Sequence, residues 1–220
     1  MTDLPATNRT MLTEVKPEGV LELYLADLPM PTPKDHEVVV KVQATPINPS
    51  DLGLMVGAAD VTSARAINRD GLPGIAMNVS DAGMRFMAGR MGQALPIGNE
   101  GWGVVVAAGA SPEAQGLMGK TVALIGGEIY AQYRCLAAQM CMPLPDGTAP
   151  EDGASCFVNP LTSLGFVETM KLEGYKAIVH AAAASNLGQM LVKICKADGI
   201  PLVNIVRSEE QVALLKAIGA

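Results

Sequence analysis

The sequence predicts a mixed α/β chain in which a compact antiparallel β-barrel is followed by a parallel α/β unit. Up to about Pro145, short runs of alternating apolar residues are separated by glycine and proline, as is typical of antiparallel strands. After the segment PLPDGTAPEDG, the pattern changes to helix, strand, helix, strand and helix, which is typical of a parallel sheet. We therefore expect a boundary near residues 146–150 and two domains, 1–148 and 149–220.

Four apolar segments of the first domain are expected to be strands. Apolar residues recur at every second position in the clearest two, and successive side chains of a strand point to opposite faces. Each such segment can therefore bury one face against a core. The four segments are 19–29 (GVLELYLADLP), 37–44 (EVVVKVQA), 103–109 (GVVVAAG) and 120–127 (KTVALIGG).

The second domain contains a strand, a tight turn and an amphipathic helix in direct succession. Residues 176–182 (KAIVHAA) form the expected buried strand. The helix is indicated by apolar residues that recur at helical spacing, which are Leu187, Met190, Leu191, Ile194 and Cys195. This order places the first free N–H groups of the helix, and its positive dipole end, beside the turn, where they can bind an anion.

The turn HAAAASNLGQM carries small residues where a dinucleotide-binding turn carries glycines. Counting back from Gly188, the three positions of the G-x-G-x-x-G pattern are Ala183, Ser185 and Gly188. Ser185 adds a hydroxyl that can donate to a phosphate oxygen, so we expect Ala183, Ser185, Asn186, Leu187 and Gly188 to bind a cofactor. The alternative is that any strand–helix turn in a close-packed α/β domain prefers small residues.

The next strand and helix indicate which cofactor the turn would hold. Residues 201–206 (PLVNIV) are the expected strand, and Ser208 and Gln211 have the spacing of a helix capping box. At the end of this strand a NAD-binding protein places an acidic residue that holds the ribose hydroxyls, but here the residue is Arg207. A cation suits the 2′-phosphate of NADP, so NADPH is the expected cofactor. The alternative is a solvated surface arginine.

Composition excludes several classes of function. The net charge of −6 argues against a nucleic-acid partner, which needs a basic face. No run of about 18 apolar residues is present to span a membrane, and the start MTDLPATNRT lacks the features of a signal peptide, so we expect a cytoplasmic protein. The four cysteines form no CxxC pair and only two histidines are present, so no metal site is expected.

Four motifs together resemble those of medium-chain dehydrogenase/reductases, particularly the zinc-free quinone oxidoreductase and enoyl reductase branch. The resemblance implies a GroES-like β-barrel domain followed by the first half of a Rossmann domain, a doubly wound parallel sheet, with NADPH between the two. It also implies a small-molecule substrate, and a homodimer when the protein is full length. The motifs are TPINPSDLGLM (45–55), PIGNEGWGVVVAAG (96–109), NPLTSLG (159–165) and AAASNLGQM (182–190).

The residues at the superfamily's zinc positions imply a reaction without zinc. Zinc-using alcohol dehydrogenases of this superfamily carry their ligands at the positions of Asn48, Asn99 and Val158. Amide and valine side chains cannot replace thiolate and imidazole as zinc ligands. Because Cys156 lies close to the third position, a divergent zinc alcohol dehydrogenase stays an alternative.

The resemblance implies hydride transfer from NADPH to a quinone, an enone or a similar activated acceptor. Asn48 is the candidate catalytic residue, through a hydrogen bond near the nicotinamide or the substrate oxygen, and Thr162 is the expected contact beside the nicotinamide. Asn48 can instead make a turn before a proline, and Thr162 can cap a helical turn. Asp51 and Glu100 are expected to fix loops by hydrogen bonds.

Three departures from the resemblance limit this reading. Enoyl thioester reductases of the branch place a tyrosine proton donor soon after the NPSD-like motif, yet no tyrosine lies between Tyr24 and Tyr130. Enoyl thioester reduction is therefore an alternative, as is a non-catalytic NADPH-binding or structural protein. Residues 57–95 include an expected insertion, for which we predict a lid or a substrate-shaping helix. The chain ends after two strands of a fold that ordinarily has six, so we expect a longer protein.

Overall fold

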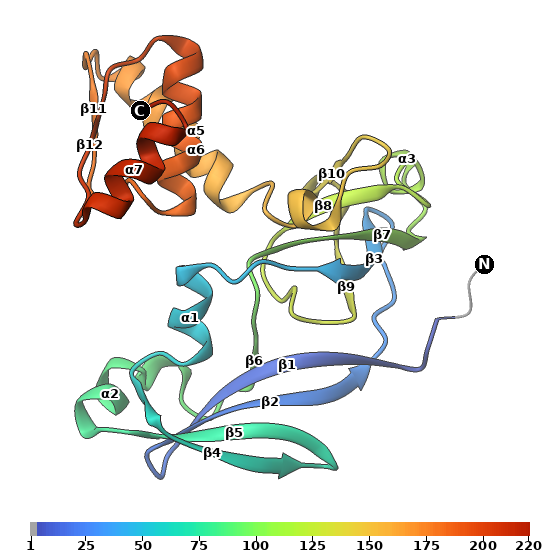
Figure 1. Ribbon diagram of the computed structural model, residues 1–220. Coiled ribbons are helices and arrows are strands. Elements are labelled where there is room, and N and C mark those ends of the chain that lie inside the picture. The colour runs from blue at the N-terminus through green and yellow to red at the C-terminus, as the bar shows by residue number, and fades with distance from the viewer. Residues whose placement is uncertain (1–3) are drawn as a thin grey trace. The chain divides into compact units, whose positions relative to one another are not determined.

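The computed structural model describes residues 4–220, which divide into two compact units, the first ending at Ser155 and the second spanning Cys156–Ala220 (Figure 1). The division lies a few residues beyond the expected boundary at 148, because helix α4 (Pro150–Ala154) packs on the first unit. A Cβ atom on Gly153 of this helix would lie 2.0 Å from Cδ1 of Trp102, so the glycine permits the contact.

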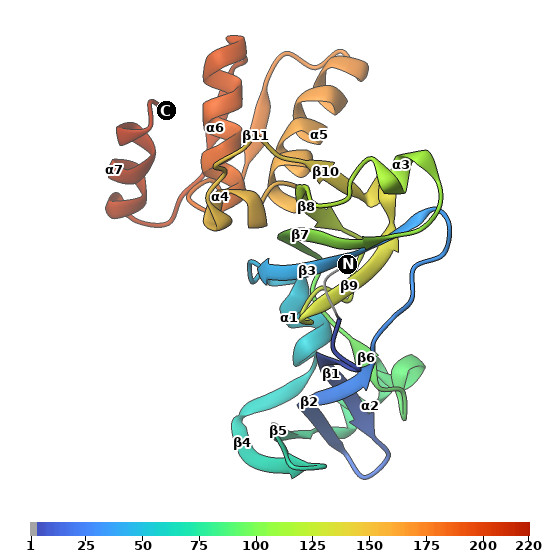
Figure 2. The ribbon, with the colours of Figure 1, turned by 90° about the vertical axis from the view of Figure 1, so that its right-hand side faces the viewer.

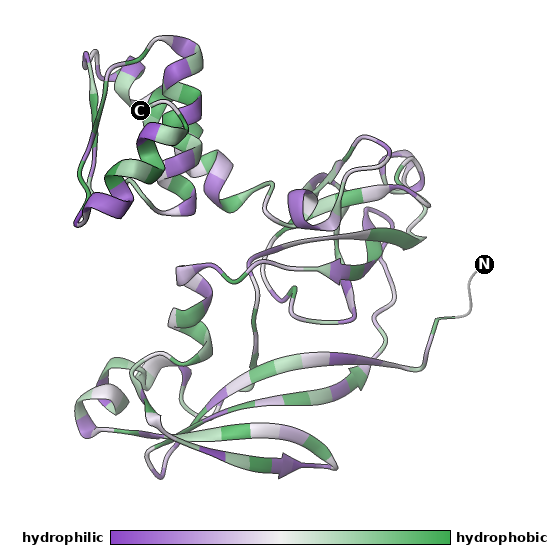
Figure 3. Ribbon diagram, in the orientation of Figure 1, coloured by the Kyte–Doolittle hydropathy of each residue, from purple (hydrophilic) through white to green (hydrophobic). Residues whose placement is uncertain are grey.

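The first unit contains two five-stranded antiparallel sheets, and all four expected strands form. The first sheet has the order β4-β5-β2-β1-β6 and the second has the order β10-β8-β7-β3-β9. Hydrophobic and hydrophilic residues alternate along the strands of both sheets, as Figure 3 shows. This alternation buries one face of each sheet in a core.

The strands of the first sheet are β1 (Thr7–Lys16), β2 (Val20–Pro29), β4 (Ala59–Arg69), β5 (Leu72–Val79) and β6 (Leu95–Pro96). Those of the second are β3 (Glu37–Ala44), β7 (Glu100–Ala108), β8 (Thr121–Ile125), β9 (Tyr133–Ala137) and β10 (Cys141–Pro143). Helices α1 (Pro49–Met55), α2 (Asp81–Phe86) and α3 (Pro112–Gln115) complete the unit, with 3-10 turns at Ala88–Arg90 and Ala138–Met140.

The segment 57–95, expected to supply a lid or a helix, is mainly a β-hairpin. Strands β4 and β5 pair with each other, and β5 pairs with β2, so the hairpin widens the first sheet. Asp70 and Gly71 join the two strands with φ values of 52° and 83°, the left-handed conformation of a tight hairpin turn. The register of β4 shifts between Asp60 and Arg65. Only the short pieces at 81–86 and 88–90 are helical.

The second unit contains the predicted succession of helices and parallel strands. Strands β11 (Ile178–His180) and β12 (Leu202–Asn204) are parallel, and each is shorter than the expected segment. Helices α5 (Val158–Leu172), α6 (Asn186–Asp198) and α7 (Glu209–Ala217) surround a core, with α5 and α6 beside β11 (Figure 2). The apolar side of α6 predicted from its periodicity is buried there, including Leu191 and Cys195.

No helix among residues 4–220 is long and apolar enough to cross a membrane.

The contact between α4 and the only tryptophan of the chain gives a prediction about stability. Substitution Gly153→Ala should destabilise the protein by about 1–3 kcal/mol, because overpacking displaces neighbouring groups, and should shift the fluorescence of Trp102. Urea unfolding followed by this fluorescence measures both effects. Gly53→Ala is the control, since a Cβ atom there meets nothing within 4 Å. Equal stability of the two variants would contradict the prediction.

Candidate functional site

A hollow of about 450 Å³ in the second unit follows the ends of the two parallel strands. It brings together three of the residues predicted to bind a cofactor, Ala183, Ser185 and Arg207. Ligands of open parallel sheets bind beyond the carboxyl ends of the strands, where this hollow lies. Its complete lining is Ala181, Ala182, Ala183, Ala184, Ser185, Ile205, Val206, Arg207 and Gln211.

Ser185 is the N-cap of α6, and its Oγ accepts a hydrogen bond of 3.1 Å from the N–H of Gly188. The hydroxyl hydrogen is still available to donate to an anion in the hollow. A Cβ atom on Gly188 would lie 2.2 Å from the carbonyl oxygen of Ala183, so only glycine fits this close approach. A single glycine, Gly188, thus allows the start of α6 to approach the backbone of the turn as closely as in a glycine-rich loop.

Arg207 is exposed and takes part in no ion pair among residues 4–220. Its backbone N–H donates a hydrogen bond of 2.9 Å to Oε1 of Gln211. The Oγ of Ser208 accepts from the N–H of Gln211 at 3.4 Å, so one half of the predicted capping box forms. The sequence identified Gln211 only as a cap, but its side chain also lines the hollow and holds the backbone of Arg207.

The other predicted cofactor residues of this unit do not line the hollow. Asn186, Leu187 and Gly188 form the first turn of α6, and the carbonyl of Leu187 accepts a hydrogen bond of 3.1 Å from the hydroxyl of Ser163. Thr162 lies in α5, where its Oγ1 donates to the carbonyl of Val158 at 2.7 Å. Their roles toward a cofactor stay predictions.

In the first unit, a buried network of hydrogen bonds fixes the start of α1. The backbone N–H of Asn48 donates to Oδ2 of Asp51 at 2.7 Å, and the side-chain amide of Asn48 donates to Oε1 of Glu100 at 2.9 Å. The N–H of Asn99 donates to Oδ1 of Asp51 at 3.0 Å. Asn48, Asp51 and Glu100 are each at most 3% exposed. Asp51 and Glu100 therefore fix loops as expected, while the catalytic role of Asn48 stays a prediction.

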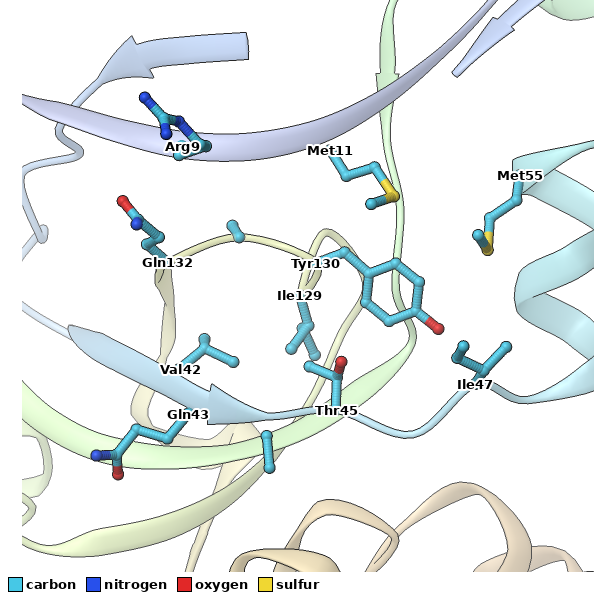
Figure 4. A pocket seen from close by; sticks show the side chains of 12 residues that line it. Arg9, Met11, Val42, Gln43, Thr45, Ile47, Met55, Ile129, Tyr130 and Gln132 are labelled. Carbon is cyan, nitrogen blue, oxygen red and sulfur yellow. The ribbon is translucent and has the colours of Figure 1, made fainter. Parts of the chain in front are cut away.

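The loop before Asn48 borders an apolar pocket of about 460 Å³ (Figure 4). Asn48 does not line it, but Thr45, Ile47 and Met55 from the same motif do. The pocket's lining is Arg9, Met11, Val42, Gln43, Ala44, Thr45, Ile47, Met55, Ile129, Tyr130, Ala131 and Gln132.

Tyr130 is the functional candidate that sequence reasoning missed. Its hydroxyl donates a hydrogen bond of 2.8 Å to the carbonyl of Pro46, 84 positions away in the sequence. Its ring packs on Gly98, where a Cβ atom would lie 2.4 Å from Cδ1 of the tyrosine. Burial, reinforced by the nearby Asp51 carboxylate, raises the pKa of Tyr130 above its usual value. The phenol therefore stays protonated and able to donate at neutral pH.

Two of the three positions that would carry zinc ligands are occupied by hydrogen-bonded amides, and the third is occupied by Val158. The side chain of Asn48 bonds to Glu100, and that of Asn99 donates to the hydroxyl of Ser50 at 2.9 Å. In the described part of the chain, residues 4–220, no three His, Cys, Asp or Glu side chains gather in a group that could hold a metal ion.

No protein-family model matches the chain. It is 26% identical to mouse prostaglandin reductase-3 over 193 residues, which is 88% of the chain and 44% of that protein. It is 32% identical to a quinone oxidoreductase of Pseudomonas aeruginosa over 127 residues, which is 56% of the chain and 39% of that protein. A solved structure from Mesorhizobium loti, provisionally named an NADPH:quinone reductase, matches with a TM-score of 0.72 at 30% identity, over 100% of the chain and 60% of that structure.

These homologues confirm the resemblance that the motifs indicated. Mitochondrial enoyl-[acyl-carrier-protein] reductases are also among the relatives, and the structural neighbours include complexes with NADPH. The chain spans about half of the length of the curated relatives that it matches.

The network at α1 predicts that a negative charge at position 48 is poorly tolerated. Substitution Asn48→Asp places a carboxylate against the buried Glu100, which should cost about 3–5 kcal/mol of stability at pH 7, as for an uncompensated buried charge. Because the repulsion raises the pKa of the new pair, protonation should restore part of the stability as the pH falls from 7 to 5. Urea unfolding at both pH values measures this. Asn48→Ala is the control and should show little such pH dependence; an equal pH response would contradict the prediction.

Proposed function

We propose that this chain is part of a zinc-independent reductase of the medium-chain dehydrogenase/reductase superfamily, which transfers hydride from NADPH to a quinone, an enone or a similar acceptor. The observation that carries the proposal is the hollow beyond β11 and β12, which is lined by the capping Ser185 and by Arg207, a cation that forms no ion pair within residues 4–220. Relatives named as quinone and prostaglandin reductases support the reaction class.

The residues of this hollow fit a phosphorylated dinucleotide. The hydroxyl of Ser185 and the first N–H groups of α6 suit the pyrophosphate, because helix N-termini favour anions. The guanidinium of Arg207 suits the 2′-phosphate that distinguishes NADPH from NADH, since charged hydrogen bonds to phosphate are strong. In this proposal Ala183, Asn186, Leu187 and Gly188 complete the turn, and Thr162 contacts the nicotinamide.

When bound, NADPH supplies the hydride, and the chain's own residues have to hold the acceptor and stabilise its developing negative charge. The apolar pocket beside Tyr130 suits the body of a quinone or an enone. The protonated hydroxyl of Tyr130 can exchange its bond to Pro46 for one to an acceptor oxygen. Asn48 is the proposed second donor, and its amide would then leave Glu100.

A second candidate function is reduction of an enoyl thioester. Relatives named as mitochondrial enoyl-[acyl-carrier-protein] reductases favour it, and Tyr130 offers a phenol in the first unit although the expected tyrosine after the NPSD-like motif is missing. The two candidate functions use the same cofactor, NADPH, and differ in the molecule that accepts the hydride.

The proposal is tested by mixing the protein with NADPH and a panel of quinones, enones and one enoyl thioester while following nicotinamide absorbance. Consumption of NADPH with quinones or enones is the expected result, and consumption only with the thioester would favour the second candidate. Binding of NADPH without consumption with any acceptor would indicate a non-catalytic protein. Stoichiometric zinc in metal analysis would contradict the zinc-independent reaction.

Arg207 is predicted to determine the choice of cofactor. Substitution Arg207→Ala should weaken NADPH binding about 10-fold or more, because a hydrogen bond to a charged group contributes about 1.5–3 kcal/mol. Binding of NADH, which lacks the 2′-phosphate, should change little. Isothermal titration measures both affinities, with Lys193→Ala, an exposed cation outside the hollow, as the control. Equal loss for the two cofactors would remove the argument for NADPH.

Tyr130 is predicted to bind the acceptor through its hydroxyl. Substitution Tyr130→Phe should raise the KM for a quinone about 2- to 12-fold, the effect of losing about 0.5–1.5 kcal/mol from one neutral hydrogen bond. The affinity for NADPH should not change. Steady-state kinetics and titration measure the two quantities. Tyr24→Phe is the matched control, since the hydroxyl of Tyr24 bonds to Glu14 outside this pocket; an equal KM effect in both variants would overturn the assignment.

A further inference from the structure

A second hollow of the first unit lies between α1 and the helical residues that follow β5. It has a volume of about 430 Å³, within the usual range for small-molecule sites. It shares no lining residue with the Tyr130 pocket or with the hollow at Arg207. Its lining is Gly53, Leu54, Phe86, Met87, Gly89 and Arg90, and we call it the α1–α2 groove.

Arg90 brings a positive charge to this groove without an acidic partner. Its Nη1 donates a hydrogen bond of 2.6 Å to the carbonyl of Leu54, and its Nη2 lies 3.1 Å from the sulfur of Met87. In the part of the chain that the structure describes, residues 4–220, no carboxylate forms an ion pair with Arg90. A guanidinium has five N–H donors, so further donors are left for a ligand.

The environment of this guanidinium favours an anion. Burial lowers the pKa of Arg90 from its usual value, because removal from water disfavours the charged form. An arginine is nevertheless protonated at neutral pH. An anion that binds here would therefore meet a partly desolvated cation, where electrostatic attraction is stronger than in water.

Phe86 and two glycines supply the remaining properties of a site. The side chain of Phe86 is 82% exposed although the residue is aromatic, so a ligand that covers the ring gains hydrophobic energy. A Cβ atom at Gly53 or at Gly89 would meet nothing within 4 Å, which means that the groove is open beside both residues.

We propose that the α1–α2 groove binds a small amphipathic anion, a carboxylate or phosphate joined to an aromatic or aliphatic body. The anionic group pairs with Arg90, and the apolar body packs on Phe86 and Met87. The unpaired cation decides this choice of ligand, because an uncharged apolar partner would leave the guanidinium without compensation. The site is separate from the proposed cofactor and acceptor sites.

The test uses three probes that share a phenyl group and differ in charge. Isothermal titration of the full chain with 4-phenylbutyrate, phenyl phosphate and 4-phenylbutanol should show binding of at least one anion. The alcohol should bind at least about 10-fold more weakly, as expected from the loss of about 1.5–3 kcal/mol of a charged hydrogen bond. The preferred anion distinguishes a carboxylate site from a phosphate site.

Three variants distinguish a loss of ligand binding from a loss of folding. Arg90→Gln keeps a donor for Leu54 but removes the charge, and should weaken anion binding about 10-fold or more. Arg85→Gln is the matched control, since Arg85 is an exposed arginine of α2 that does not line the groove. Gly53→Leu adds a side chain to a residue that lines the groove and at which a Cβ atom meets nothing within 4 Å, so it should abolish binding while the melting temperature is kept.

Several results would overturn the proposal. These are no binding of either anion to the unchanged chain, equal anion affinity in Arg90→Gln and Arg85→Gln, and full binding by a folded Gly53→Leu variant. If Phe86→Ala instead dissociates a dimer and no probe binds, the groove is a contact between copies of the chain. If Arg90→Gln fails to fold, Gly53→Leu alone decides.

Discussion

The buried carboxylate of Asp51 is the constraint on which the candidate site of the first unit depends. It accepts the backbone N–H groups of Asn48 and Asn99, so it joins the start of α1 to the start of β7. A carboxylate that is 2% exposed is tolerated only with such partners, since an unpaired buried charge is very costly. The carbonyl of Pro46, in the loop before Asn48, accepts the hydrogen bond of the Tyr130 hydroxyl. Asp51 therefore also contributes indirectly to the position of Tyr130 in the wall of the apolar pocket.

In the second unit, the equivalent constraint is steric. The close contact of Gly188 with the carbonyl of Ala183 brings α6 against the turn, and Ser185 can then cap the helix from the neighbouring position. The loss of two glycines from the usual pattern therefore costs the turn little, because alanine and serine are small enough. Arg207 reaches the same hollow from the next strand, held by Gln211. Each half of the proposed cofactor site is thus fixed by a hydrogen bond between a side chain and the backbone.

Local patterns predicted the elements well, and long-range contacts account for most of what the sequence did not show. The alternation of 37–44 and the helical spacing after Gly188 appear directly as β3 and α6. Tyr130 was missed because its link to Pro46 spans 84 positions of the sequence and no local period marks it. The hairpin at 59–79 was missed because β4 is largely polar and exposed, although Asp70-Gly71 is a recognisable turn signal. The homologues support the reaction class, while the roles of Asn48 and Thr162 depend on a cofactor geometry that sequence patterns do not encode.

The register shift in β4 has a consequence for how the chain behaves among other chains. β4 is the outer strand of its sheet, and a long outer strand with free backbone groups is a template on which another chain can add a strand. The irregular stretch between Asp60 and Arg65 interrupts that row of groups, and Arg65 adds an exposed charge to the strand. Another strand could not form a regular row of hydrogen bonds with β4 here, and it would have to remove water from the charge of Arg65. The hairpin that widens the first sheet therefore also makes the outer edge of that sheet a poor template for the addition of another strand.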